Sequence, residues 1–160
     1  MPDDLRLEPS EAVLLAQRLI DEGRPFHAHE VLEAVWKSGP DYQRDLWKGL
    51  AQIAVGLTHA RRGNGRGAVA LLRRGSAAVE GYRTRPTAGG ADDLAGRVPG
   101  ELDAAGVVQA TTDLADRIAA DGLAALSDAD LCLHLTRGGP ARVATDASAG
   151  PGLPRTPRPG

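Results

Sequence analysis

Four stretches with helical spacing of apolar residues follow one another in this chain, and only two or three residues separate each from the next. The clearest apolar face belongs to the third stretch and consists of Leu46, Leu50, Ile53 and Leu57. Their spacing of i, i+4, i+7 and i+11 is that of one side of an α-helix. Connections this short favour antiparallel neighbours. We therefore predict an all-α protein whose core is a compact antiparallel bundle.

The predicted core helices span residues 9–22, 25–38, 42–62 and 65–82. Ser10 is the expected N-cap of the first helix, and Gly23 is its expected C-terminal stop. Pro25 suits the first turn of the second helix, since that position needs no backbone N–H donor. Gly63 begins the turn that ends the third helix.

The predicted organisation has four parts: a core domain at 1–83, a linker at 84–106, accessory helices at 107–136 and a tail at 137–160. The linker is rich in glycine and proline. The tail holds too few large apolar residues to bury a core, so we expect it to be disordered. Within the third part, helical patterns at 107–122 and 128–136 predict one or two accessory helices, the second capped by Ser127.

Composition excludes several classes of protein. The single cysteine, Cys132, rules out an internal disulfide and a cysteine-based zinc site. No apolar run approaches the roughly 20 residues of a membrane span, and the acidic N-terminus lacks the apolar segment of a signal peptide. We therefore expect a cytoplasmic protein without a membrane partner. The net charge of −2 neither favours nor excludes a polyanionic partner.

The second and third predicted helices carry ionisable side chains on sides expected to be packed. At 100° per residue, His29 and Glu33 share one side of the second helix, and the apolar residues on that side are Phe26, Leu32 and Trp36. The third helix has a separate stripe made of Gly49, Gln52, Gly56 and His59. The simplest model packs this glycine stripe against the second helix. Gln52 and His59 would then face His29 and Glu33 in a polar pocket.

Three interpretations of this pocket stay open, and the question of enzymatic activity stays open with them. The first is a buried polar network that fixes the helix register. The second is a zinc, iron or manganese site on His29, Glu33 and His59, with hydrolytic chemistry, although no known metal motif matches. The third is acid–base catalysis by Glu33 with His29 as its partner. No nucleophile constellation accompanies them, and catalytic residues stay unassigned.

An arginine-rich strip follows the pocket residues in the chain. It consists of Arg61, Arg62, Arg66, Arg73 and Arg74. With the free N–H groups at the start of the fourth helix, Arg62, Arg66 and Arg73 are candidates for binding an anion or a nucleic acid. The alternative, which we favour, is an ordinary solvated surface. A further alternative is a homodimer in which the glycine stripe receives a helix from a second copy.

Three sequence motifs occur in an order that resembles the family known as domain of unknown function 309, a small all-helical prokaryotic domain. They are the segments 26–36 and 45–55 (followed by His59) and 63–72. The resemblance covers about residues 12–82 and implies a helical bundle. It places a polar signature on His29, Glu30, Glu33, Gln52, His59 and Asn64, which adds Glu30 and Asn64 to the candidate pocket. Lys48 departs from the family pattern, where glutamine is more frequent. Because that family has no established activity, the resemblance implies none.

Overall fold

The structure is a computed structural model that describes residues 8–38, 43–84 and 102–136. The helices of this part are α1 (Pro9–Asp21), α2 (Pro25–Ser38), α3 (Arg44–Arg61), α4 (Gly65–Arg83) and α6 (Ala104–Asp121). Two single turns follow, η2 (Leu123–Ala125) and η3 (Ala129–Leu131). The described residues form no strand, only an isolated bridge between Leu102 and Thr136. The all-α prediction is confirmed.

The helix ends lie within two or three residues of the predicted ones. Gly23 and Gly63 have positive φ angles of 79° and 84° just after α1 and α3, a backbone conformation that residues with a Cβ rarely adopt. The predicted N-cap of α1 is wrong by two residues. Ser10 lies inside the helix, and Glu8 precedes it, with its N–H donating to the Glu11 carboxylate at 3.2 Å.

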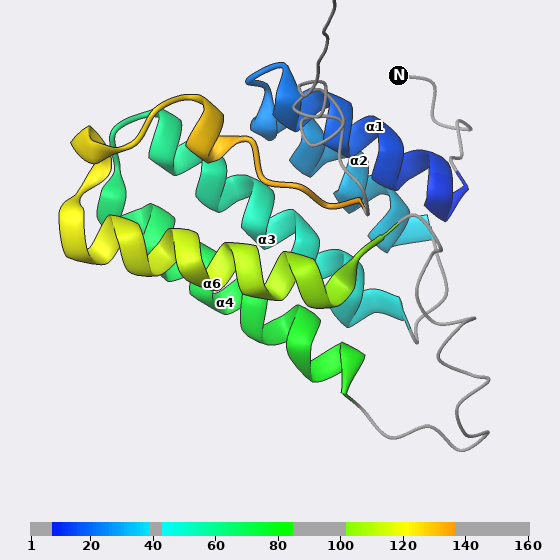
Figure 1. Ribbon diagram of the computed structural model, residues 1–160. Coiled ribbons are helices and arrows are strands. Elements are labelled where there is room, and N and C mark those ends of the chain that lie inside the picture. The colour runs from blue at the N-terminus through cyan, green and yellow to red at the C-terminus, as the bar shows by residue number, and fades with distance from the viewer. Residues whose placement is uncertain (1–7, 39–42, 85–101, 137–160) are drawn as a thin grey trace, which may run out of the picture.

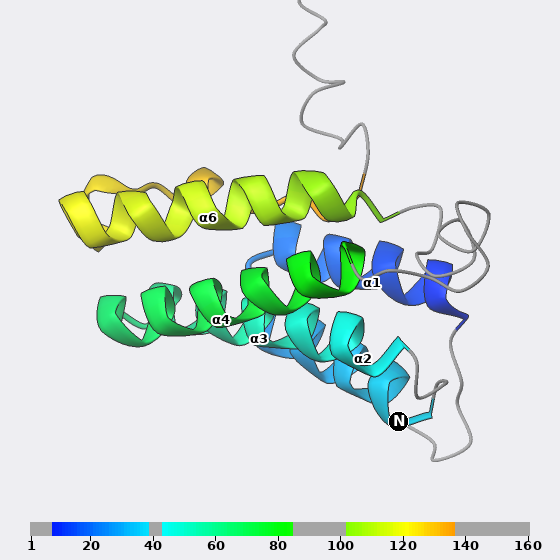
Figure 2. The same ribbon diagram turned by 90° about the horizontal axis from the view of Figure 1, so that it is seen from below.

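Each helix packs against its neighbour in the chain: α1 on α2, α2 on α3, α3 on α4 and α4 on α6 (Figure 1). In the view turned by 90°, α6 lies in a separate layer over α4, away from α2 (Figure 2). The most central helix is α3, in which Trp47, Leu50 and Leu57 are buried. The site described below is therefore built over the most central helix of the fold.

The C-terminal part differs from the sequence-based expectation. The helix predicted at 128–136 is wrong, because only the single turn η3 forms there. The predicted cap is wrong as well, because the N-cap of this turn is Asp128; Ser127 lies before it, and its hydroxyl accepts from the Asp130 N–H at 3.4 Å. After it the chain is extended, and Leu131, Leu133 and Leu135 are buried while the residues between them are partly exposed. This alternation has a period of two, as in a strand, so the helical interpretation used the wrong period.

A buried glutamine holds the extended segment in place. Gln17 of α1 is 5% exposed, and its side-chain N–H donates to the Leu133 carbonyl at 2.9 Å. Its side-chain oxygen accepts from the backbone N–H of Leu135. The Leu135 carbonyl in turn accepts from the Asp103 N–H at 2.8 Å, which joins the segment to the start of α6. In Figure 1 the segment runs across α3, between α1 and α6.

The buried side chains of α6 and of residues 131–135 belong to the same hydrophobic core as those of α1–α4. Most of the predicted linker, residues 85–101, and the predicted tail at 137–160 lie outside the described residues. The division into domains stays a prediction. None of the described helices combines the length and the apolar character that crossing a membrane requires.

Candidate functional site

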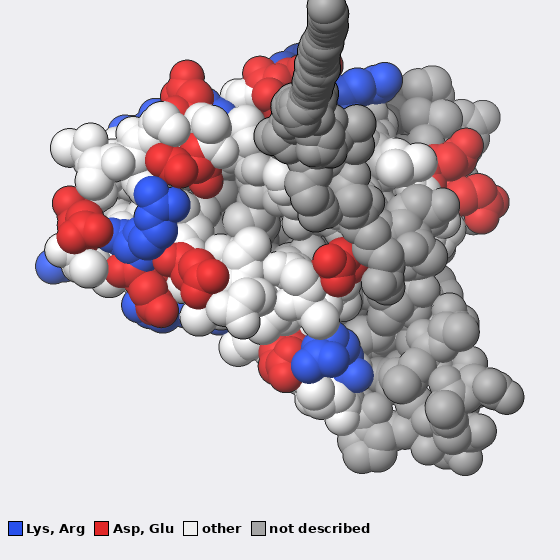
Figure 3. Space-filling model, in the orientation of Figure 1, with Lys and Arg blue, Asp and Glu red and all other residues white. Residues whose placement is uncertain are grey.

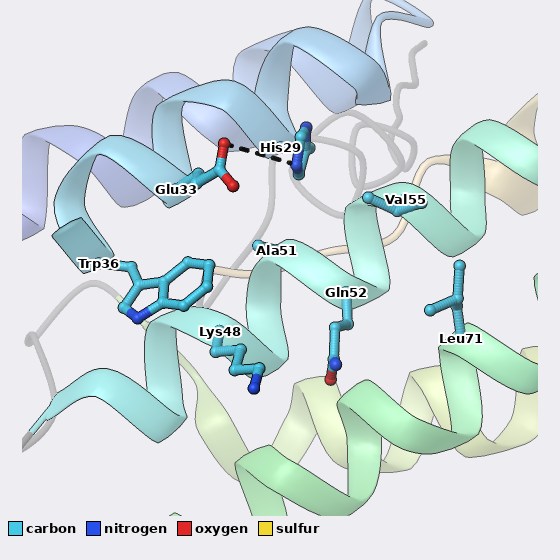
Figure 4. Close-up of a pocket in the computed structure, with 8 residues that line it drawn as sticks. All are labelled: His29, Glu33, Trp36, Lys48, Ala51, Gln52, Val55 and Leu71. Carbon is cyan, nitrogen blue, oxygen red and sulfur yellow. Dashed lines mark ion pairs between the residues drawn. The ribbon is translucent and has the colours of Figure 1, made fainter.

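An open groove of about 210 Å³ runs over α3, between α2 and α4 (Figure 4). It is lined by His29, Glu33 and Trp36 of α2, by Lys48, Ala51, Gln52 and Val55 of α3, and by Leu71 of α4. The α2 residues follow i, i+4 and i+7 spacing, and the α3 residues follow i, i+3, i+4 and i+7 spacing. Each set thus occupies one side of its helix. The groove contains three of the side chains predicted for the pocket.

His29 and Glu33 lie side by side on the α2 wall. The His29 Nε2 atom is 3.9 Å from Glu33 Oε1, and Lys37 Nζ is 4.0 Å from the other oxygen of the same carboxylate. The side chains of His29 and Glu33 are 21% and 35% exposed, so both are partly solvated. His29 Nδ1 is buried and has no hydrogen-bond partner among the described residues. The ring of Phe26 lies against the imidazole, with the two centroids 5.5 Å apart.

In the described part of the chain, the polar side chains of the α3 wall, Lys48 and Gln52, form no hydrogen bond or ion pair with those of the α2 wall, His29 and Glu33. Lys48 Nζ lies 5.9 Å from the centroid of the Trp36 ring. In the view of Figure 4 the Lys48 and Gln52 side chains leave α3 on the side away from His29 and Glu33. No hydrogen bond among the described residues joins Gln52 to either of them. The groove residues therefore do not form the self-satisfied network that the first interpretation required.

The packed side of α2 is rotated from the predicted one. We expected Phe26 to lie on the packed side with His29 and Glu33, but Phe26 is 43% exposed. Leu32 is buried as expected, and the other core-facing residues are Ala28, Val31 and Val35. These residues also follow helical spacing, and burying them avoids the cost of removing an imidazole and a carboxylate from water. His29 and Glu33 consequently lie at the edge of the core, where a ligand could reach them.

The glycine stripe of α3 faces α4, so its predicted packing against α2 is wrong. A Cβ placed on Gly49 would lie 3.0 Å from the Gly75 carbonyl oxygen, and one on Gly56 would lie 3.0 Å from the Leu72 side chain. The face suggested for a helix of a second copy is thus filled by α4 of the same chain. A homodimer through another surface stays a prediction.

His59 and Asn64 form a separate hydrogen-bonded pair at the turn between α3 and α4. The Asn64 side-chain oxygen accepts from the Gly67 N–H at 2.9 Å, which caps α4. This contact fixes the orientation of the amide, so its nitrogen lies 3.1 Å from His59 Nδ1 and donates to it. Neither residue lines the groove, and Glu30 is exposed on α2. Of the six signature residues, three therefore line the groove, two lie at the turn, and Glu30 lies at neither place.

Replacing Asn64 with alanine should lower the free energy of unfolding by about 1 kcal/mol, because it removes the N-cap of α4. Urea denaturation of the two proteins measures this difference. Asn64→Asp is the matched control, since aspartate keeps the acceptor for the Gly67 N–H and should retain most of the stability. An alanine variant as stable as the parent would show that the hydrogen bonds of Asn64 contribute nothing to the free energy of unfolding.

The predicted metal ligands are not brought together. Across the described ranges, no three His, Cys, Asp or Glu side chains lie close enough to hold a metal ion. His29 and Glu33 share the groove, whereas His59 points to Asn64. Cys132 is partly buried, and its sulfur lies 4.0 Å from the Arg61 guanidinium. Burial raises the pKa of its thiol, and the opposing effect of Arg61 is smaller.

The arginine strip is interrupted by acidic partners. Arg73 is 2.9 Å from Asp116 of α6, and Arg61 is 3.6 Å from Asp128. Arg62 lies over the Phe26 ring at 5.9 Å. On the face shown in Figure 3, acidic and basic side chains alternate over the described part of the surface.

Within the predicted anion site, Arg73 is in an exposed ion pair with Asp116, and the Asn64 side chain already accepts from the Gly67 N–H at the start of α4. Arg66 stays exposed. An anion or nucleic-acid function through Arg62 and Arg66 stays a prediction.

Sequence comparison confirms the family resemblance for the segment that contains the groove. Residues 13–71 match the family model described as Domain of unknown function (DUF309). The uncharacterized protein YpuF of Bacillus subtilis (strain 168) is 46% identical over 48 residues, which are 29% of this chain and 28% of that protein. No solved structure matches. All eight groove residues fall inside the matched segment.

Proposed function

We propose that the segment matching this family, residues 13–71, is a binding module that takes a compact small molecule in the groove over α3. One observation carries the proposal. The polar groups of His29, Glu33, Lys48 and Gln52 surround one hollow without satisfying one another across it. Unpaired polar side chains that line an otherwise apolar hollow are typical of ligand sites.

The orphaned nitrogen of His29 supports a binding role over a purely structural one. Leaving a buried hydrogen-bonding group unpaired costs about 1–3 kcal/mol, and natural proteins rarely retain that cost without a use. His29 Nδ1 is such a group. A position selected for stability alone would favour an apolar residue here, since Phe26 and Ala51 already provide apolar surroundings.

The size of the groove limits its ligand. Its volume of about 210 Å³ is below the roughly 300–1,000 Å³ typical of pockets for drug-sized molecules. The groove is also open on one side, so it covers only part of what it binds. A compact molecule with one ring or a short aliphatic chain fits these dimensions.

The proposal predicts that His29→Ala removes binding at little cost in stability. We expect the free energy of unfolding to change by less than about 1 kcal/mol, because the partly exposed imidazole makes only one long ion-pair contact. Binding is followed by ¹⁵N–¹H spectra during titration with mixtures of compact one-ring acids, amides and amines. In the parent, shift changes should cluster on groove residues; in the variant, they should disappear.

His27→Ala is the matched control, because His27 is an exposed histidine on the same helix that does not line the groove. This variant should bind as the parent does. Two results would count against the proposal: shift changes that map elsewhere, or a loss of several kcal/mol in His29→Ala. The second result would give His29 a structural role in place of the proposed binding role.

A further inference from the structure

The charges around the groove are unevenly paired. Glu33 lies near two cationic groups of its own helix, His29 at 3.9 Å and Lys37 at 4.0 Å. Lys48 comes from the opposite wall, and no carboxylate of the described residues pairs with it. Among the described residues, the Lys48 ammonium instead lies over the Trp36 ring, 5.9 Å from its centroid. The charge left available to a ligand is therefore positive.

The donors that accompany this charge lie one helical turn away. Lys48 and Gln52 are four residues apart on α3, so their side chains are neighbours on the same side of the helix. Figure 4 shows both leaving α3 in the same direction, toward α4. An ammonium group offers three N–H donors and a primary amide offers two. Together they match the two acceptor oxygens of a carboxylate.

Apart from His29 and Glu33 on the α2 wall, the rest of the lining is apolar. Ala51 forms the floor, and Val55 and Leu71 close the end of the groove beside Gln52. At the other end the Trp36 indole provides a flat wall. An aromatic or short aliphatic body can cover these surfaces while its charged end stays beside Lys48.

Resting on the proposed function, we infer that the ligand is a compact organic carboxylate. Its carboxylate is held by Lys48 and Gln52, and its apolar body lies against Trp36, Val55 and Leu71 and reaches the His29 imidazole on the α2 wall. Because Lys48 is exposed, its ion pair is screened by water and salt and is worth at most about 1 kcal/mol, or about fivefold in affinity. Charge selection in this groove should therefore be measurable but modest.

Three probes that share one ring separate charge from shape: benzoate, benzamide and benzylamine. Each is titrated into the ¹⁵N-labelled full chain while the indole N–H of Trp36 is followed, with its signal assigned from Trp36→Phe. We expect benzoate to bind several-fold more tightly than benzamide, and benzylamine to bind most weakly. Lys48→Gln should weaken benzoate about fivefold and leave benzamide unchanged.

Arg18→Gln is the matched control, because it makes the same change in net charge at an exposed position of α1 outside the groove. It should leave all three affinities unchanged. Equal binding of benzoate and benzamide at the groove would overturn the carboxylate inference and leave the proposed function standing. If no probe shifts groove resonances at millimolar concentration, both fail.

Discussion

Replacing Gly75 with alanine is expected to destabilise the protein by about 3 kcal/mol, one of the largest effects of any conservative substitution in this chain. A Cβ at this position would lie 2.6 Å from the Gly49 carbonyl oxygen and 2.7 Å from Ile53 Cγ1. Both distances are well inside van der Waals contact, and the first involves backbone. The added methyl group can be accommodated only if α3 and α4 separate, which weakens the packing of the most central helix.

Gly81→Ala is the matched control, because Gly81 is an exposed glycine on the same helix and nothing lies within 4 Å of a Cβ placed there. This substitution should stabilise the protein by about 0.5–1 kcal/mol, since alanine restricts the unfolded chain and favours the helix. Urea denaturation of the parent and of both variants tests the pair. If Gly75→Ala were as stable as Gly81→Ala, α3 and α4 would not cross closely at Gly75.

Sequence periodicity predicted α1–α4 because it reports a local property, namely which residues share a side of a helix. It could not identify the helix that packs there. The stripe containing Gly49 and Gly56 correctly indicated a close approach, but any of the neighbouring helices could have made it. Gly75, on the predicted apolar face of α4, is the residue that meets Gly49. A glycine on each of two helices indicates which pair of helices crosses closely, whereas a glycine stripe on one helix indicates only that some helix packs there.

The candidate site shows the same limit. His29, Glu33 and Gln52 line one groove, as predicted, because i, i+4 spacing on one helix and proximity of two consecutive helices bring them together. Two overlapping faces of α2 could have been buried, and composition alone did not decide between them. Because burying ionisable groups is costly, the face that is buried is the one containing Val31 and Val35.

His59 and Asn64 were grouped with the groove because they share its signature, yet their contact is local. An asparagine three residues before Gly67, at the start of a helix, is itself an N-cap pattern and would have assigned Asn64 to the turn. Gln17 had no such signal. Its backbone partners are more than 110 residues away in the chain, and its one nearby contact, with the Asp21 carboxylate at 3.1 Å, does not indicate them.

Gln17→Met is expected to lower the free energy of unfolding by about 3 kcal/mol. Methionine has nearly the same length and shape but can replace neither the donor to the Leu133 carbonyl nor the acceptor for the Leu135 N–H. Leaving a buried backbone group unpaired costs about 1–3 kcal/mol, and two such groups depend on this side chain. Urea denaturation gives the overall loss, and native-state hydrogen exchange at Leu135 locates it.

The choice of methionine separates hydrogen bonding from packing. If the buried position of Gln17 mattered only for filling space, a residue of similar volume would be tolerated within about 1.5 kcal/mol. Gln109→Met, at an exposed position of α6, controls for the change of residue type and should alter stability by less than about 0.5 kcal/mol. Unchanged stability together with unchanged exchange at Leu135 would mean that the extended segment is held by its leucines alone. A large loss would instead make the α1 glutamine the link between the first helix and the end of the described chain.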